Sequence, residues 1–113
     1  LILVSDGNSA TGMPDGRYYL GTVPVTVQAG ICRDADGKLA GSTLTLERAV
    51  RNMMELGRVD LAQALTMVTL NPARLLGLAG RQGVLAAGAE ANLVWLNSQL
   101  QVQGTVIRGQ PSF

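Results

Sequence analysis

Asp6 is the residue of this 113-residue sequence best placed for acid–base chemistry. The apolar residues Leu1 to Val4 run directly into Ser5-Asp6-Gly7. A continuous apolar run bounded by turn residues predicts a strand buried on both faces, as in a parallel sheet or barrel. Parallel α/β folds carry their chemistry at the C-terminal ends of such strands. Asp6 is therefore a candidate catalytic carboxylate; the alternative, which composition alone favours, is that Asp6 caps a turn or the following helix.

Other reactive groups are scarce in this sequence. Histidine is absent and Cys32 is the single cysteine, which excludes from this chain His-based triads and metal sites built from His or Cys. Cys32 is predicted to be a small strand residue, because no histidine can activate it as a nucleophile. The remaining acidic residues in turns are predicted to be solvated and to form no metal site: Asp15, Asp34, Asp36 and Glu90.

The composition predicts a folded protein of the cytoplasm. Hydrophobic residues make up 47% of the chain and charged residues 15%, which argues against disorder. A net charge of +1 without a Lys/Arg cluster indicates neither a nucleic-acid partner nor an anionic membrane. No apolar stretch approaches the roughly 20 residues of a membrane span. A lone cysteine fits a reducing compartment. Because the sequence opens without Met inside an apolar run, we expect a piece of a longer polypeptide.

The elements that must position Asp6 are mixed in type. A loop from Asp6 to Gly16 precedes a predicted meander of short strands, in which Asp36-Gly37 is a hairpin signal. The predicted strands are Arg17–Leu20, Val23–Gln28, Gly30–Arg33 and Lys38-Leu39. Such a small sheet is not stable by itself.

Helices and further strands follow the predicted meander. Apolar spacing predicts a helix over Leu46–Gly57 and a second from about Asp60, as its cap, to Thr69. Asn71-Pro72 predicts the cap and first turn of a short third helix. Strands are expected over 91–96 and 102–108, with Trp95 packed between layers. This order indicates the end of one domain followed by part of another.

Three stretches together resemble the amidohydrolase superfamily and, within it, the N-acetylglucosamine-6-phosphate deacetylase family. The third stretch occurs across many amidohydrolases, whereas the first two are more specific to the deacetylases. The stretches are Leu3–Gly7 through Ala10–Gly16 to Tyr19–Gly21; Leu39–Thr45 with Ala49–Asn52; and Thr69–Arg74 with Leu76–Leu78, then Gly83–Leu85 through Gly88 to Ala91–Val94. The resemblance covers essentially the whole chain and about the C-terminal third of a family member.

The resemblance implies an α/β fold, the C-terminal fragment of a metal-dependent (β/α)8 amidohydrolase barrel with strands of a small β-sandwich domain. Residues 1–78 would be the C-terminal part of the barrel, with Leu1 to Val4 as its last strand and a small β insert at 17–39. Residues 79–113 would be the C-terminal strands of the sandwich, whose partner strands lie outside this chain.

The resemblance also implies a site. Asp6 matches the family's catalytic aspartate, and Leu39, Ala40 and Gly41 match its substrate-binding turn. Gly41 has an alternative role, which is only to permit a tight turn. The implied cofactor is a divalent metal, zinc or similar, whose Glu and His ligands lie outside this chain. Ser5 and Gly7 stand where Thr and Ala are more usual, but neither change touches the Asp6 carboxylate.

The implied activity is the deacetylation of N-acetylglucosamine 6-phosphate to glucosamine 6-phosphate and acetate. The partner would be a small amino-sugar phosphate, and a homodimer is implied for the full-length protein. The alternatives are a deacetylase of the galactosamine epimer, another amidohydrolase, or a truncated chain without activity. The isolated chain is expected to be inactive and to associate through open strand edges.

Overall fold

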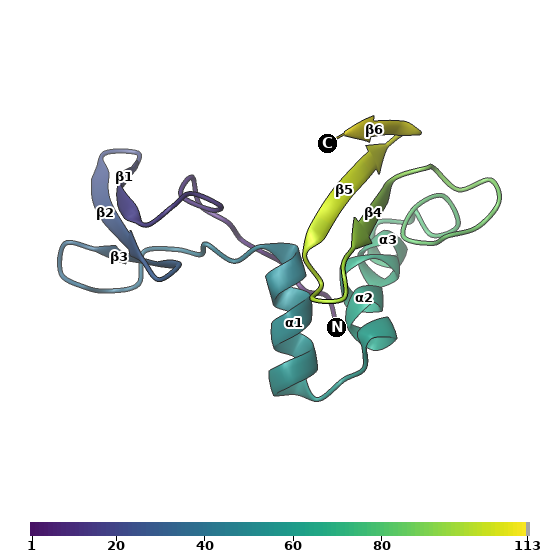
Figure 1. Cartoon of the computed structure of the whole chain (residues 1–113), viewed down its shortest axis with the longest axis horizontal. Helices are drawn as coiled ribbons and strands as arrows, with labels where there is room; N and C mark the ends of the chain where they lie inside the picture. The colour runs from purple at the N-terminus through teal and green to yellow at the C-terminus, as the bar shows by residue number, and fades with distance from the viewer. Residues whose placement is uncertain (113) are drawn as a thin grey trace. The chain divides into compact units, whose positions relative to one another are not determined.

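A computed structural model describes residues 1–112 of the chain. The chain divides into two compact units, one formed by residues 4–49 and the other by residues 1–3 with the chain from Val50 onward. Each unit contains one three-stranded antiparallel sheet, drawn as arrows in Figure 1. No helix within residues 1–112 is both long and apolar enough to cross a membrane.

The first sheet confirms the predicted meander. Its strands are β1 (Gly16–Leu20), β2 (Val23–Gln28) and β3 (Ile31–Asp34), in the order β1-β2-β3. The β2–β3 turn has positive φ at both Ala29 and Gly30, as a two-residue type I′ hairpin requires. Lys38-Leu39 was predicted as a strand, but Leu39 forms only an isolated bridge to Arg33.

The first sheet buries one face, and that face holds the core of its unit. The buried residues of β2 alternate with exposed ones, as a half-buried strand requires. The cluster contains Val25, Val27 and Cys32 together with Ala10, which comes from the loop after Asp6. Ala40 packs against the same cluster. The sheet therefore supports both segments that the sequence singled out for function. Cys32 is a strand residue, as predicted, and its side chain lies in this core.

The helices lie close to their predicted positions. They are α1 (Leu46–Gly57), α2 (Leu61–Val68) and α3 (Leu70–Leu75). Asp60 caps α2 with a complete capping box, since its side chain accepts from Gln63 N and the Gln63 side chain accepts from Asp60 N. Asn71 was predicted to cap α3, and this was wrong. Its side-chain Nδ2 instead donates to Leu1 O at 2.8 Å, and Thr69 occupies the cap position without a side-chain bond.

The predicted strand at Leu1 to Val4 is not observed among the described residues. A strand needs a neighbouring strand for its hydrogen bonds, and the only described backbone bond from this segment joins Leu3 N to Met67 O, in helix α2, at 3.1 Å. The apolar run therefore lies against α2 and α3 through Leu3 and Leu1, instead of in a ladder.

The second sheet consists of β4 (Leu93–Leu96), β5 (Val102–Ile107) and β6 (Gln110–Ser112) (Figure 1). Trp95 pairs with Gly104 across β4 and β5, and its ring covers this glycine. A Cβ added to Gly104 would lie 2.2 Å from Trp95 Cζ2, so only glycine leaves room for the ring. Successive residues of β4, Leu93, Val94 and Trp95, are all exposed. Because successive side chains point to opposite faces, both faces of this sheet carry exposed apolar groups.

Candidate functional site

Asp6 lies in the loop before β1 and is exposed. Its φ is +46°, a left-handed conformation that Asp and Asn tolerate better than other residues with a side chain. Within residues 1–112 its carboxylate takes part in no hydrogen bond or ion pair. The carboxylate is therefore not the cap of a turn or helix, and it is accessible to solvent and small molecules.

The segment after Asp6 lies beside the Ala40–Ser42 segment. Gly7 and Ser42 form a parallel β-bridge, and Asn8 N donates to Ser42 O at 2.8 Å. The Thr11 hydroxyl donates to the same carbonyl at 3.2 Å. The structure therefore brings together two segments that are more than thirty residues apart in the sequence.

Asn8 makes a further connection that the sequence analysis missed. Its Nδ2 donates to Ala40 O at 3.0 Å, and its Oδ1 accepts from Ala10 N at 2.9 Å. The second bond is an Asx turn, for which an asparagine two residues before the donor is a recognisable sequence signal. The bond to Ala40 has no local signal, because it depends on the tertiary fold.

Of the three residues predicted to bind substrate, Leu39 is exposed, Ala40 is half-buried and Gly41 is exposed. Gly41 has φ +81°, and an added Cβ would lie 3.1 Å from Asn8 Nδ2. The left-handed turn therefore favours glycine here, and a Cβ at this position would crowd the Asn8 amide. A shallow hollow of about 310 Å³ lies beside Gly41; its other lining residues are Gly30, Ile31, Cys32, Ser42, Thr43, Leu44 and Arg48.

The chain does not make a metal site by itself. Across residues 1–112 no three His, Cys, Asp or Glu side chains come together in a way that could hold a metal ion. Asp6 is the one predicted site residue with a carboxylate, and one carboxylate does not provide the ligand set of a divalent cation. A metal beside Asp6 would need ligands from outside this chain.

The acidic residues predicted to be solvated take part in local structure. The Asp15 carboxylate accepts from Ala29 N at 2.7 Å, and the Asp34 carboxylate accepts from the backbone N–H groups of Asp36 and Lys38 at 3.0 and 2.9 Å. These bonds explain why the turns of the first sheet carry aspartate. Asp15 and Asp34 are structural residues of the first sheet.

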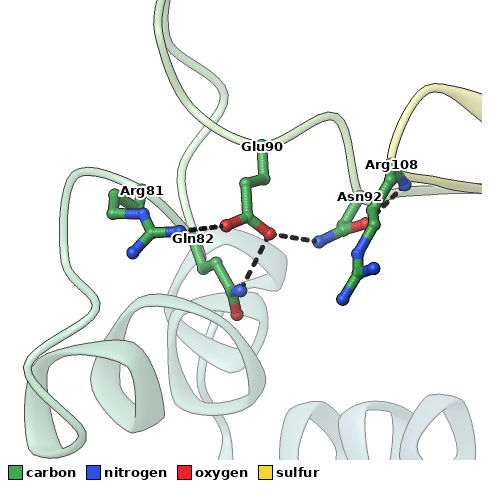
Figure 2. A network of polar contacts seen from close by, with 5 residues as sticks. All are labelled: Arg81, Gln82, Glu90, Asn92 and Arg108. Carbon is green, nitrogen blue, oxygen red and sulfur yellow. Dashed lines mark hydrogen bonds and ion pairs between the residues drawn. The ribbon is translucent and has the colours of Figure 1, made fainter.

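Glu90 is the centre of a polar network in the second unit (Figure 2). Its carboxylate accepts from Arg81 Nη2 at 2.7 Å, from Gln82 Nε2 at 3.0 Å and from Asn92 Nδ2 at 3.3 Å. Asn92 Oδ1 in turn accepts from Arg108 N at 2.8 Å. The hydrogen bonds from Arg81 and then Gln82 lower the pKa of Glu90 below its ordinary value. Glu90 therefore joins the 81–92 loop, through Asn92, to the turn between β5 and β6, and the prediction of a merely solvated side chain was wrong.

Comparison with known protein families assigns nearly the whole chain to one family. Residues 7–111 match the amidohydrolase family. A putative N-acetylgalactosamine-6-phosphate deacetylase of Escherichia coli K12 is 48% identical, over 97% of this chain and 66% of that protein. An N-acetylglucosamine-6-phosphate deacetylase of Vibrio furnissii is 38% identical, over the whole of this chain and 28% of that protein.

Solved structures agree with the sequence comparison. The crystal structure of N-acetylglucosamine-6-phosphate deacetylase from Thermotoga maritima matches all of this chain with a TM-score of 0.85 and 36% identity, and 31% of that structure is covered. The chain thus spans less than one third of this structure and of the Vibrio relative, and has the same α/β arrangement with small sheets as the matched region. By this family match, and by the fold that accompanies it, the chain belongs to the amidohydrolase family.

Proposed function

We propose that this chain is the C-terminal part of a hydrolase that removes the acetyl group from N-acetylglucosamine 6-phosphate. The products are glucosamine 6-phosphate and acetate. The observation that carries the proposal is the bridge between Gly7 and Ser42, because it joins the residue after Asp6 to the residue after the segment expected to bind the sugar phosphate. The names of the relatives support the same substrate class.

Asp6 would carry the proton in this reaction. Amide hydrolysis forms a bond between a water oxygen and the acetyl carbon and breaks the bond between that carbon and nitrogen. A carboxylate within reach of the water takes its proton and later donates that proton to the leaving nitrogen. General acid–base catalysis of this type is worth about 10²–10⁴ in rate. The left-handed backbone at Asp6, held by the neighbouring bridge, would fix the direction of the carboxylate.

Leu39, Ala40 and Gly41 would bind the substrate. A turn of small residues allows backbone N–H and C=O groups to approach a ligand closely, and Gly41 leaves its backbone uncovered by a side chain. The divalent metal implied by the family resemblance, zinc or a similar ion, would be held by Glu and His residues outside this chain.

The remaining architecture follows from the same proposal. Residues 1–78 would complete a (β/α)8 barrel, in which Leu1 to Val4 would pair with strands of the preceding polypeptide. Residues 79–113 would belong to a β-sandwich domain. The exposed apolar groups on both faces of β4 support this, since the second sheet of a sandwich would cover one of these faces. We place the complete enzyme in the cytoplasm, as a homodimer.

The galactosamine epimer is a second candidate substrate. The 48% identity to a putative N-acetylgalactosamine-6-phosphate deacetylase favours it. The two sugars differ only in the orientation of the C4 hydroxyl, and none of the proposed site residues identifies the group that contacts this hydroxyl. A direct comparison of kcat/KM on the two substrates separates the candidates.

The test compares this chain with the extended protein, by which we mean the chain together with the polypeptide encoded in frame before it. Acetate release from both sugar phosphates is measured with added Zn²⁺, for each protein and for its Asp6→Asn variant. We expect turnover only by the extended protein with Asp6. An extended protein that is inactive on both sugars, or as active with Asp6→Asn, would contradict the proposal.

A further inference from the structure

Asn8 connects the two halves of the candidate site through its side chain. Its Nδ2 donates to Ala40 O, in the proposed substrate-binding turn, and its Oδ1 accepts from Ala10 N in its own loop. Asn8 is half-buried, so both bonds are partly shielded from water. No other side chain of the loop from Asp6 to Thr11 bonds to Ala40 among the described contacts, whereas the Thr11 hydroxyl bonds to Ser42.

The core of the first sheet and the close approach of Gly41 also constrain the position of Asn8. Ala10, which follows the Asx turn, is 1% exposed in the core of the first sheet, and Ala40 packs against the same core. Gly41 leaves 3.1 Å between Asn8 Nδ2 and the place where a Cβ would stand. The absence of a Cβ at Gly41 leaves room for the Asn8 amide, whose hydrogen bond to Ala40 O couples it to the backbone of the turn.

We propose that Asn8 is a positioning residue of the deacetylase reaction, which holds the Ala40–Gly41 backbone in register with Asp6. This inference rests on the proposed function. The Nδ2–Ala40 bond would fix where the sugar phosphate sits relative to the carboxylate that moves the proton. A displacement of about 1 Å between such groups costs on the order of 100-fold in rate.

Two substitutions separate positioning from turn formation. Asn8→Ala removes both side-chain bonds. Asn8→Ser retains a hydroxyl that can accept from Ala10 N, as serine does in turns, but is too short to reach Ala40 O. We expect both variants of the extended protein to raise KM about tenfold and to lower kcat. Asn8→Ser should keep a melting temperature closer to that of the unsubstituted protein.

The KM value is the decisive readout. A merely structural loss reduces the fraction of folded enzyme, which lowers the apparent kcat and leaves KM unchanged. The matched control is Asn97→Ala, because Asn97 Oδ1 accepts from Gln99 N and Gln101 N in the loop between β4 and β5. The control should leave KM unchanged.

A double-mutant cycle with Gly41→Ala tests the contact directly. The added Cβ would press on the amide of Asn8. Gly41→Ala should therefore raise KM more in the protein with Asn8 than in the Asn8→Ala protein. We expect the two fold-increases in KM to differ by a factor of at least about three.

The outcomes distinguish this inference from the proposed function. An extended protein without turnover overturns both. Turnover with unchanged KM in Asn8→Ala and Asn8→Ser, or an equal rise of KM in Asn97→Ala, overturns the positioning role alone and leaves the deacetylase assignment intact.

Discussion

At the scale of single residues, the left-handed backbone of Asp6 decides which substitution gives a clean test of catalysis. Asparagine tolerates φ +46° at least as well as aspartate, whereas alanine in this region costs about 1 kcal/mol. The conformation is held by the Gly7–Ser42 bridge, so a substituted residue cannot relax without breaking it.

We predict that Asp6→Asn and Asp6→Ala in the extended protein both lower kcat by about 10²–10⁴. Asp6→Asn should leave the free energy of unfolding within about 0.5 kcal/mol of the unsubstituted value, as for a surface substitution, and Asp6→Ala should lower it by about 1 kcal/mol. Urea unfolding of the three proteins measures the difference. Equal stability of the two variants would show that the strain is absent.

The residue scale also shows the limit of sequence reasoning. Asp60 was found from the sequence because its capping partner is Gln63, three residues away. Asn8 and Asn71 were missed or misassigned because their partners, Ala40 and Leu1, are 32 and 70 residues away. A local pattern identifies a local hydrogen bond, and only the folded chain shows a distant one.

At the scale of elements, the first sheet serves as the support of the candidate site. Its strands were predicted because short segments with β-branched or aromatic residues lie between glycine-containing turns. The sequence did not show what lies on the buried face, since Ala10 and Ala40 are small residues in loops with no periodic pattern.

Because the first sheet supports the candidate site, a core substitution in β2 should change KM as well as stability. Val27 is 2% exposed, and Val27→Ala should destabilise the fold by about 2 kcal/mol through lost burial and a residual cavity. Because the same core holds Ala10 and Ala40, we also expect a two- to threefold rise in KM, on the order of a few tenths of a kcal/mol. Val23→Ala is the matched control, since Val23 lies in the same strand and is 51% exposed. Equal effects of the two substitutions would contradict this role.

The Glu90 network predicts a pH-dependent contribution to the stability of the second sheet. Its folded-state pKa is lowered, chiefly by the hydrogen bond from Arg81. A lowered pKa means that the contribution is complete above the unfolded-state value, about 4.3, and is lost as the pH falls through the lower folded-state value.

Glu90→Gln should therefore lower the melting temperature of the extended protein at pH 7, and this difference should shrink as the pH falls below about 4. Thermal unfolding at a series of pH values measures it. Glu55→Gln, an exposed position of α1, is the control and should show little difference at any pH. A difference for Glu90→Gln that does not depend on pH would mean that the charge of Glu90 is not what stabilises the network.

At the scale of the whole molecule, exposed apolar surface is the main feature. Large hydrophobic residues of the second sheet are exposed by 39–59%, namely Leu93, Val94, Trp95, Val102 and Ile107. Exposed apolar side chains in such number favour association when nothing covers them. Composition alone did not reveal this surface, which the proposed β-sandwich domain would cover in part.

We predict that the isolated 113-residue chain associates as its concentration rises and binds the dye ANS, while the extended protein does so far less. Sedimentation at several concentrations measures the association. A chain that remains monomeric, with a sharp and concentration-independent thermal transition, would show that the surface needs no partner.

The two bonds that join the first residues to the helices also set an order of events during synthesis. Leu1 O and Leu3 N are bonded to Asn71 and Met67, so the segment before Asp6 leaves the ribosome well before its partners. At about 5–20 residues per second, that segment waits roughly 4–14 s for residues about 70 positions later. The β1–β3 meander, by contrast, pairs only strands that are neighbours in the sequence, so its pairing partners emerge soon after one another. During this interval Leu1 and Leu3 lack the bonds to α3 and α2 that hold them in the folded chain, so this segment reaches its final position late in synthesis.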